Sequence, residues 1–316
     1  TATIIFSSGS TGEPRGVMLS HHNIISNIEG MRMLMHPSPS DHITSPLPLF
    51  HSFGFTATLW FPLLSGFSVT WHSNPLDGAK IAEVVRERRS TILLATPTFL
   101  DIYARKAEPA DFSTLKWVIV GAEKLRRRIA EAFEKKFGIM PFEGYGATEL
   151  SPVVSFNLPD VEAGGSFQPG HKIGSVGHPI PGISCRIVDP ESGRDLSPGE
   201  AGLLLIKGPG VMKGYLNRPD LTEQVLKDGW YETGDIASLD EDGFITISDR
   251  LSRFSKISGE MVPHLAVEEE YLKETGTTEP VLAVTSVPDD RKGERLVVLF
   301  TEGAGTKEAL KAIMDR

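Results

Sequence analysis

Residues 115–138 read LKWVIVGAEKLRRRIAEAFEKKFG, and this stretch decides the fold class. Its first part contains the short apolar run WVIV, which is typical of a buried strand. Its second part is predicted to be a helix that ends at Gly138, because glycine is favoured directly after a helix. A strand, a turn and a helix in this order form the repeating unit of a mostly parallel sheet flanked by helices.

The same alternation runs through the first half of the chain. Further strands are predicted at residues 1–6, 67–72 and 90–97. Further helices are predicted at residues 22–34 and 78–89, and a third starts at Pro97. We expect these helices to bury apolar stripes made by Ile24, Ile25, Ile28 and Met31 and by Ile81, Val84 and Val85. The sequence therefore predicts an α/β fold with a mostly parallel sheet over residues 1–165.

The sequence pattern changes near residue 160. Residues 160–170 read as a glycine-rich loop, and residues 166–249 contain short strands separated by turns, which predicts a small β-rich subdomain of hairpins or a small barrel. Residues 250–316 contain a helix, two strands and a final helix, which we expect to be the start of a small α+β lid domain. Because the chain starts inside a strand and stops in that helix, we expect it to be a piece of a longer protein.

Composition excludes several function classes. The 316 residues are 40% hydrophobic and 23% charged, as in ordinary globular proteins, and the net charge of −9 argues against a nucleic-acid partner. The single cysteine, Cys185, excludes an intrachain disulfide and fits a reducing compartment. No apolar run of about 18 residues is present, so no membrane span is expected. We expect a cytoplasmic location, or attachment to the inner face of the membrane through other parts of a longer parent.

The loop SSGSTGEPRG at residues 7–16 is rich in glycine and hydroxyl side chains. Such a loop presents backbone N–H groups and hydroxyls at close range, and Arg15 adds a permanent positive charge. A polyphosphate is its natural ligand, and the alternative is a flexible surface loop. The loop is not a Walker motif, and neither it nor GPGVMKG at residues 208–214 matches the dinucleotide pattern.

Further motifs follow this loop in the chain. They are PLFHSFG at 48–54, VGAEKL at 120–125, GYGATE at 144–149, GWYETGD at 229–235 and DRLSRFSKISGE at 249–260. Together with the loop, they resemble in content and order the motifs of the adenylate-forming superfamily, which includes acyl-CoA synthetases, peptide synthetase adenylation domains, luciferases and acyl–carrier-protein synthetases. The last motif looks closest to the synthetase module of bifunctional 2-acylglycerophosphoethanolamine acyltransferases, which links the chain to phospholipid and fatty acid metabolism.

The resemblance implies an AMP-forming acid–thiol ligase that uses ATP and Mg²⁺. A fatty acid would be activated to an acyl-adenylate and then transferred to the thiol of acyl carrier protein or CoA. The alternative is a nucleotide-binding sensor or scaffold without turnover. The family's C-terminal Gly-Lys motif is absent, so we expect this chain by itself to be inactive or weakly active.

The resemblance also assigns the phosphate and adenine contacts. The family more often has lysine where Arg15 stands. Thr148 would reach the α-phosphate, and Glu149 would hold Mg²⁺ together with Ser7. The other residues implied to contact ATP or AMP in this part of the chain are Ser8, Gly9, Ser10, Thr11, Gly12, Gly121, Ala122, Glu123, Tyr145 and Gly146. Without the family, Glu149 would read as an exposed residue of a turn.

Three residues near the predicted lid complete the implied site. Asp235 would accept hydrogen bonds from the ribose hydroxyls, since a carboxylate is an acceptor with two oxygens. Arg250 would assist at the ribose or the phosphate. Lys256 would serve the transfer to the thiol as a catalytic residue, beside Arg15, Thr148 and Glu149. Taken alone, Asp235 would read as a turn residue and Arg250 as half of a surface salt bridge.

His51 and Phe53 are implied to line the acyl pocket. His51 stands where amino-acid-activating relatives usually have aspartate, so no carboxylate meets a substrate ammonium and an uncharged acid such as a fatty acid is expected. The alternative for His51 is a core histidine. The basic runs at 86–89 and 124–128 are typical of a solvated face, and the alternative is docking of an acidic carrier protein.

Overall fold

The computed structural model describes residues 1–8, 14–257, 260–275, 281–289 and 293–301. The chain divides into two compact units, which are described separately below. Unit 1 comprises Thr1–Arg186, Leu205–Thr233 and Leu239–Thr246, and unit 2 comprises Ile187–Leu204, Gly234–Ser238 and Ile247–Arg316. The boundaries expected at residues 165 and 249 stay predictions.

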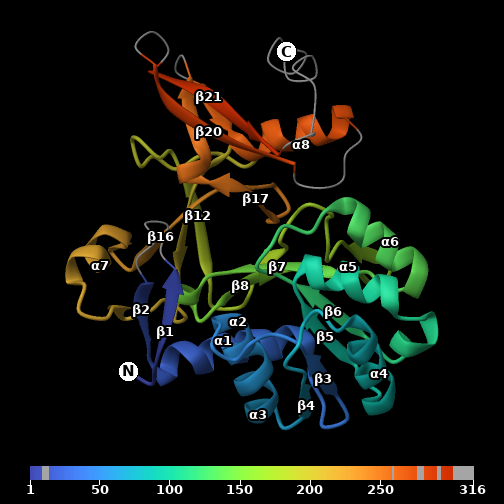
Figure 1. Cartoon of the computed structure of the whole chain (residues 1–316). Helices are drawn as coiled ribbons and strands as arrows, with labels where there is room; N and C mark the ends of the chain where they lie inside the picture. Colours follow the sequence, from blue (N-terminus) through green and yellow to red (C-terminus); the bar gives the residue numbers. More distant parts are fainter. Residues whose placement is uncertain (9–13, 258–259, 276–280, 290–292, 302–316) are drawn as a thin grey trace. The chain divides into compact units, whose positions relative to one another are not determined.

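A seven-stranded sheet forms the centre of unit 1 (Figure 1). Its order is β11 (His178–Pro179), β8 (Val153–Phe156), β7 (Phe142–Gly146), β6 (Trp117–Val120), β5 (Ile92–Ala95), β3 (His42–Ser45) and β4 (Ser68–Trp71). The strands from β4 to β7 are parallel, whereas β8 and β11 are antiparallel additions at one edge. The expected mostly parallel sheet is therefore confirmed.

Three helices cover one region of this sheet. They are α4 (Gly78–Arg88), α5 (Pro97–Lys106) and α6 (Arg127–Phe137), and the short 3₁₀ turn η2 (Pro109–Phe112) between α5 and α6 adds Phe112 to the same core. Their apolar faces pack with β5 and β6 around fully buried side chains such as Leu93, Tyr103 and Phe133. Pro97 starts α5, and Gly138 ends α6 in the left-handed conformation, as predicted.

The remaining helical elements of unit 1 are shorter, apart from α1. They are α1 (His21–Met35), α2 (Ser52–Gly54), the π-helix η1 (Phe55–Trp60), α3 (Phe61–Ser65), η3 (Thr148–Leu150) and α7 (Pro219–Val225). Ser20 and Asn23 form a capping box at the start of α1. The expected stripe of α1 is wrong at Ile25, which is 46% exposed, because it lies outside the buried face, which is formed by Asn23, Ile24, Asn27, Ile28, Gly30, Met31 and Met35.

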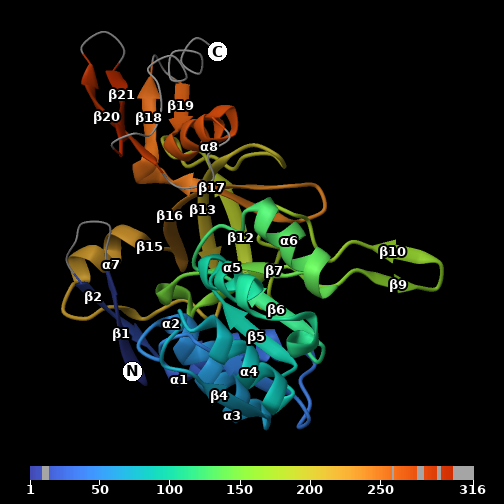
Figure 2. The ribbon, with the colours of Figure 1, turned by 45° about the vertical axis from the view of Figure 1, so that its right-hand side comes forward.

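Two hairpins complete unit 1 (Figure 2). β1 (Thr3–Ser8) and β2 (Pro14–Leu19) are antiparallel, and β14 (Gly214–Tyr215) pairs with β2. β9 (Val161–Ala163) and β10 (Ser166–Gln168) form a hairpin where the sequence predicted a plain loop. The turn of this second hairpin is Gly164–Gly165, and both residues have positive φ, as tight two-residue hairpin turns require.

The expected β-rich region contains a five-stranded sheet. Its path is β12 (Ser184–Val188), β13 (Gly202–Lys207), β16 (Trp230–Leu239) and β15 (Leu226–Lys227), and β17 (Ile245–Arg250) also pairs with β16. Short strands joined by turns predicted this kind of structure.

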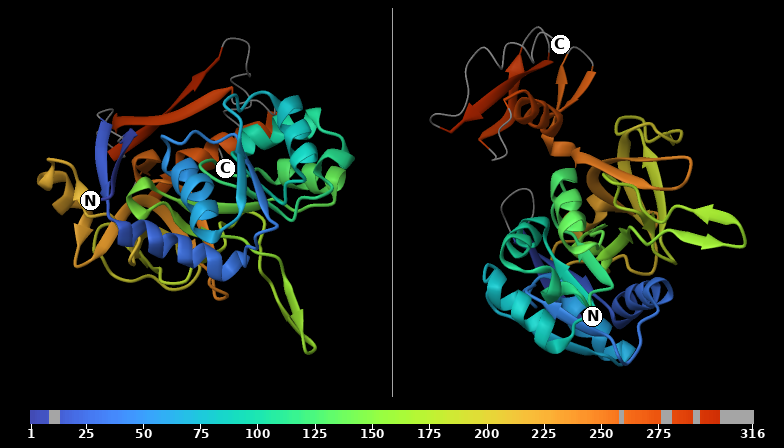
Figure 3. Two further views of the ribbon diagram at one scale, coloured as in Figure 1. Left: turned by 90° about the horizontal axis from the view of Figure 1, so that it is seen from below. Right: turned by 90° about the vertical axis from the view of Figure 1, so that its right-hand side faces the viewer.

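Unit 2 also holds a four-stranded sheet with one helix packed against it (Figure 3). The order is β19 (Glu260–Pro263), β18 (Phe254–Ile257), β21 (Gly293–Phe300) and β20 (Leu282–Asp289). The helix is α8 (His264–Thr275), and the 3₁₀ turn η4 (Leu251–Arg253) precedes β18. The final helix predicted near the C-terminus lies outside the described residues. In the part of the chain that is described, no helix is long and apolar enough to cross a bilayer.

Candidate active site

The predicted phosphate loop joins the two strands of the β1–β2 hairpin. The strand predicted at residues 1–6 extends to Ser8, and β2 begins at Pro14. Ser7 is the register partner of Arg15, so these two predicted phosphate ligands stand opposite each other at the base of the loop. Gly9, Ser10, Thr11 and Gly12 lie outside the described residues, and of Ser8 only the backbone is described.

Glu149 lies in η3, just beyond the carboxyl end of the parallel strand β7. Carboxyl ends of parallel strands are where ligands bind in α/β sheets. Glu149 is only 9% exposed, and its Oε1 accepts hydrogen bonds from Ser7 Oγ at 3.4 Å and from the Tyr215 hydroxyl at 2.9 Å. The structure therefore brings together Ser7 and Glu149, the two residues predicted to hold a metal ion.

Tyr215 also belongs to this cluster, although no sequence motif singles it out. Its ring lies 5.5 Å from the guanidinium carbon of Arg15, measured at the ring centroid. Burial raises the pKa of Tyr215 to about 12, and the negative charge of Glu149 acts in the same direction. Burial likewise raises the pKa of Tyr231, again with a contribution from Glu149. The only sequence signal for a role of Tyr215 is its position directly after the glycine-containing segment at residues 208–214.

The predicted acyl-pocket motif contacts two other motifs. Ser52 Oγ lies 3.0 Å from Thr148 Oγ1. The ring of Phe53 lies beside Gly121, where an added Cβ would be 3.5 Å from Phe53 Cε1 and 3.4 Å from the Gly144 carbonyl oxygen. Segments near residues 50, 120 and 145 therefore meet in unit 1.

His51 is exposed, so it is not the buried core histidine that was the alternative interpretation. Its Nδ1 accepts a hydrogen bond from the backbone N–H of Phe53 at 3.2 Å. Partial desolvation of the ring by the surrounding protein lowers the pKa of His51. The imidazole is therefore expected to be neutral at physiological pH.

The turn that carries Tyr145 and Thr148 is tightly closed. An added Cβ at Gly146 would lie 2.2 Å from the carbonyl oxygen of Pro152, so only glycine fits there. The N–H of Ala147 donates to that same oxygen at 3.0 Å. The spacing between Tyr145 and Glu149 is thus set by backbone contacts.

The turn after β6 is hydrogen-bonded to the start of α5. Ala122 has a positive φ of 68°. The carboxylate of Glu123 accepts hydrogen bonds from the N–H and the hydroxyl of Thr98, at 3.2 and 2.5 Å, at the start of α5. Contacts of Gly121, Ala122 and Glu123 with a nucleotide stay a prediction.

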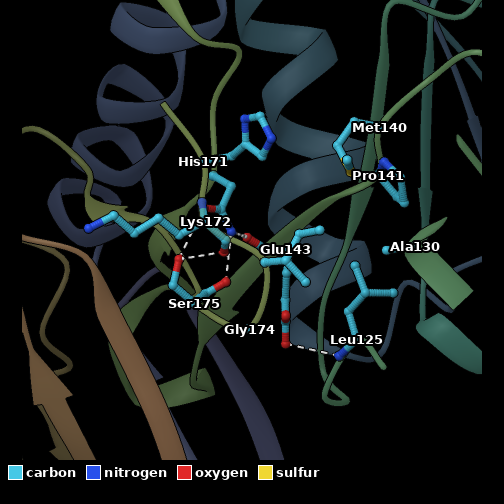
Figure 4. A pocket seen from close by; sticks show the side chains of 11 residues that line it. Leu125, Ala130, Met140, Pro141, Glu143, His171, Lys172, Gly174 and Ser175 are labelled. Atoms are coloured by element: carbon cyan, nitrogen blue, oxygen red, sulfur yellow. Dashed lines mark hydrogen bonds between the residues drawn. The ribbon is translucent and has the colours of Figure 1, made fainter. Parts of the chain in front are cut away.

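A small cavity in unit 1 is lined in part by the buried Glu143 (Figure 4). Its volume of about 10 Å³ is enough for roughly one water molecule. Glu143 accepts a hydrogen bond from the Leu125 N–H at 2.9 Å, and burial raises its pKa to about 7. None of the predicted site residues lines this cavity, whose walls are Leu125, Ala130, Met140, Pro141, Glu143, Asn157, His171, Lys172, Ile173, Gly174 and Ser175.

Unit 2 contains the predicted ribose-binding pair. Arg250 Nε lies 2.8 Å from Asp235 Oδ1, and the Asp235 side chain is 6% exposed whereas that of Arg250 is 60% exposed. The neighbouring Asp249 accepts a hydrogen bond from the Leu265 N–H at 3.1 Å and so supports the start of α8. Lys256 lies in β18 opposite Met261, and its side chain is outside the described part of the structure.

The donor set of unit 1 suits a magnesium ion that arrives with a nucleotide. Glu149 supplies a carboxylate, and Ser7 and Thr148 supply hydroxyl oxygens. Among the described residues, no group of three or more His, Cys, Asp and Glu side chains could hold a metal ion by itself. Mg²⁺ typically binds through one or two carboxylates together with substrate phosphates and water, so the residues present fit that ion.

Comparison with known proteins gives concordant matches. Residues 1–216 match the family model described as AMP-binding enzyme. A long-chain-fatty-acid–CoA ligase from Salmonella typhimurium is 33% identical over 317 residues, which cover 98% of this chain and 54% of the relative. The chain thus spans about half the length of this curated relative. The expected resemblance of this chain to the synthetase module of bifunctional 2-acylglycerophosphoethanolamine acyltransferases stays a prediction.

Solved structures give the same result. ATP-bound MatB from Rhodopseudomonas palustris matches with a TM-score of 0.83 at 29% identity, covering 99% of this chain and 60% of that chain. O-succinylbenzoate coenzyme A synthetase from Bacillus subtilis, in complex with ATP and magnesium ion, matches with a TM-score of 0.84 at 25% identity, covering 99% and 62%. The chain therefore belongs to the AMP-binding enzyme family, the adenylate-forming superfamily that its motifs resemble.

Proposed function

We propose that the protein activates a fatty acid with ATP and transfers the acyl group to a thiol. The observation that carries this proposal is the meeting, in unit 1, of Ser7 and Arg15 at the phosphate loop with Glu149. Hydroxyl, guanidinium and carboxylate groups in this arrangement can bind a triphosphate and its Mg²⁺. The family membership supports the same chemistry.

In the first step, an oxygen of the substrate carboxylate attacks the α-phosphorus of ATP. The bond from that phosphorus to the bridging oxygen breaks, which yields the acyl-adenylate and pyrophosphate. Arg15 stabilises the charge on the leaving β- and γ-phosphates, and Thr148 donates to an α-phosphate oxygen. Mg²⁺, held by Glu149 with Ser7, would supply further neutralisation of phosphate charge.

Nucleoside contacts are proposed for unit 1 and, separately, for unit 2. Tyr145 stacks on adenine beside the turn formed by Gly121, Ala122 and Glu123, and Gly146 lets the backbone approach. In unit 2, Asp235 accepts hydrogen bonds from the ribose hydroxyls, and Arg250 is placed to assist because it already pairs with that carboxylate. AMP is released from the same contacts after the second step.

In that second step, the thiol sulfur attacks the acyl carbon, the bond from this carbon to the AMP oxygen breaks, and the thiol proton is lost to solvent. Lys256 is proposed to serve this transfer. The names of relatives such as the Salmonella typhimurium ligase support a fatty acid and CoA. His51 and Phe53 are proposed to line the acyl pocket, and the neutral imidazole expected for His51 suits an acid without a second charge.

Acyl carrier protein is the other proposed thiol donor. Lys124, Arg126, Arg127 and Arg128 are all exposed at the start of α6, although Arg127 also pairs with Glu131 at 2.7 Å. A basic surface of this kind suits an acidic partner. Thioester formation measured with CoA and with carrier protein separately would distinguish the two acceptors.

The test begins with calorimetric titration of ATP and AMP in the presence of Mg²⁺. We expect both to bind the wild-type chain. Arg15→Ala should weaken ATP binding about tenfold, since charged hydrogen bonds are lost, and leave AMP binding nearly intact because AMP lacks the β- and γ-phosphates. Arg88→Ala, which removes an exposed arginine of α4, serves as the matched control.

Equal losses for ATP and AMP would assign Arg15 a structural role instead. Pyrophosphate exchange across acids of increasing chain length then tests turnover and the acid specificity. Nucleotide binding without exchange for any acid would contradict the proposed ligase and favour a binding module.

A further inference from the structure

The segment at residues 212–216 connects the two halves of the proposed phosphate site. The N–H of Met212 donates to the carbonyl oxygen of Glu149 at 2.8 Å. The N–H of Lys213 donates to Met18 in β2 at 2.9 Å, and that of Leu216 donates to Gly16 at 2.7 Å. This one short segment is therefore hydrogen-bonded both to the turn that carries Glu149 and to the strand that carries Arg15.

The side chain of Tyr215 also connects Glu149 with Arg15. Its hydroxyl donates to Glu149 Oε1 at 2.9 Å, and the Arg15 guanidinium carbon lies 5.5 Å from its ring centroid, within cation–π range. Tyr215 is only 4% exposed. It therefore contacts both the carboxylate proposed for Mg²⁺ and the cation proposed for the β- and γ-phosphates.

We propose that Tyr215 is a positioning residue for ATP binding: its hydroxyl orients the Glu149 carboxylate toward Mg²⁺, and its ring holds the Arg15 guanidinium beside the phosphate loop. This assignment rests on the function proposed above. The role differs from that of a ligand, because Tyr215 acts through Glu149 and Arg15.

The chemistry of the donor supports this role. A carboxylate is only an acceptor, so the phenol hydroxyl must be the donor in its hydrogen bond to Glu149. A neutral donor orients a carboxylate without cancelling its charge. The full charge of Glu149 therefore stays available to a divalent cation, which a lysine or arginine at this position would oppose.

The backbone of Tyr215 is itself anchored by α7. Its N–H donates to Thr222 Oγ1 at 2.9 Å, and the Thr222 hydroxyl in turn donates to the carbonyl oxygen of Arg218 at 2.9 Å. β14 also pairs with β2, with Tyr215 opposite Val17. These contacts hold the phenol in place before any ligand arrives, which is what a positioning residue requires.

The test is calorimetry of ATP binding with Mg²⁺, ATP binding with EDTA, and AMP binding, for wild type, Tyr215→Phe and Tyr215→Leu. Tyr215→Phe keeps the ring and removes the hydroxyl, which bonds Glu149 and also interacts with Arg15, so ATP affinity should fall about tenfold with Mg²⁺ and less in EDTA, while AMP affinity stays unchanged. Tyr215→Leu also removes the ring beneath Arg15, so the loss of ATP affinity in EDTA should be larger than for Tyr215→Phe. Tyr103→Phe is the matched control, because it removes the bond of another buried tyrosine hydroxyl, to Pro75, in the same unit.

An unchanged ATP affinity of Tyr215→Phe in Mg²⁺ would overturn the assignment. Equal losses for ATP and AMP, with and without Mg²⁺, would also overturn it, because they would indicate a general structural role. If the wild-type chain bound neither nucleotide, the proposed function would fail first, and this assignment with it.

Discussion

Two buried carboxylates, one in each unit, are proposed nucleotide-binding residues, yet their surroundings differ. Glu149 in unit 1 is 9% exposed and accepts hydrogen bonds from the neutral hydroxyls of Ser7 and Tyr215. Asp235 in unit 2 is 4% exposed and pairs with the guanidinium of Arg250. The first carboxylate has neutral hydrogen-bond donors, and the second has a cationic partner.

The difference explains how the two groups could serve different parts of a nucleotide. A carboxylate oriented by neutral donors keeps its charge for a divalent cation. A carboxylate paired with a guanidinium is largely neutralised, and it suits uncharged hydroxyl groups that need only acceptors. The metal-binding role fits Glu149, and the ribose-binding role fits Asp235.

Glu143 extends the comparison to a third buried carboxyl group. Its side chain accepts a hydrogen bond from a backbone N–H, that of Leu125, and burial raises its pKa to about 7. One neutral donor does not compensate the desolvation of a charged carboxylate. Burial with one neutral hydrogen-bond donor therefore raises the pKa of this carboxyl group. Glu143 lies only two residues from Tyr145 in the sequence.

Removing the charge of Glu149 should have the largest effect. In Glu149→Gln, ATP affinity in Mg²⁺ should fall by about a hundredfold, since changes to residues that merely support a metal ligand already cost about 10–100-fold in metal affinity. Calorimetry with Mg²⁺ and with EDTA measures this, and the two affinities should become equal. Glu131→Gln, an exposed change on α6, is the control. A persistent Mg²⁺ dependence in Glu149→Gln would assign the metal to other residues.

Glu143→Gln should produce an effect of similar size, on stability rather than on nucleotide binding. The folded pKa of Glu143, about 7, lies above the ordinary value of 4.5, so the folded state binds more protons between these pH values. The stabilising contribution of the protonated form is therefore complete below pH 4.5 and is lost as pH rises through about 7, at a cost of about 3 kcal/mol. The glutamine variant lacks this titration, so its free energy of unfolding should gain on that of wild type as pH rises.

Chemical denaturation of both proteins across this pH range provides the measurement. Parallel stability profiles for wild type and Glu143→Gln would mean that the carboxyl group is ionised in the folded state throughout.

Asp235→Ala should have the smallest of the three effects. ATP and AMP binding should both weaken about tenfold, whether or not Mg²⁺ is present, because the ribose is common to both ligands. The fold should survive, since the Arg250 side chain that loses its partner is 60% exposed and can be hydrated. Asp189→Ala, at a turn aspartate of unit 2 that bonds the N–H groups of residues 191 and 192, is the control. An unchanged calorimetric affinity for AMP would contradict the ribose-binding role and would mean that Asp235 is only a turn residue.

The sequence by itself determined the elements and the family. Short apolar runs predicted β5 and β6, Pro97 predicted the start of α5, and Gly138 predicted the end of α6, because these signals act over a few residues. The motifs identified the family because they follow one another along this chain in the same order as in the family. They also named Ser7, Thr148, Glu149, Asp235 and Arg250 as candidates before any contact was known.

Only the tertiary structure decided which of these residues meet. The hydrogen bond from Ser7 to Glu149 spans 142 residues and that from Tyr215 to Glu149 spans 66, and no local pattern encodes such contacts. For the same reason the sequence did not distinguish Ile25, which is exposed, from its buried neighbour Ile24. The charges and the burial around a carboxyl group depend on segments that are far apart in the sequence. The different surroundings of Glu149, Asp235 and Glu143 are therefore set only when the chain has folded.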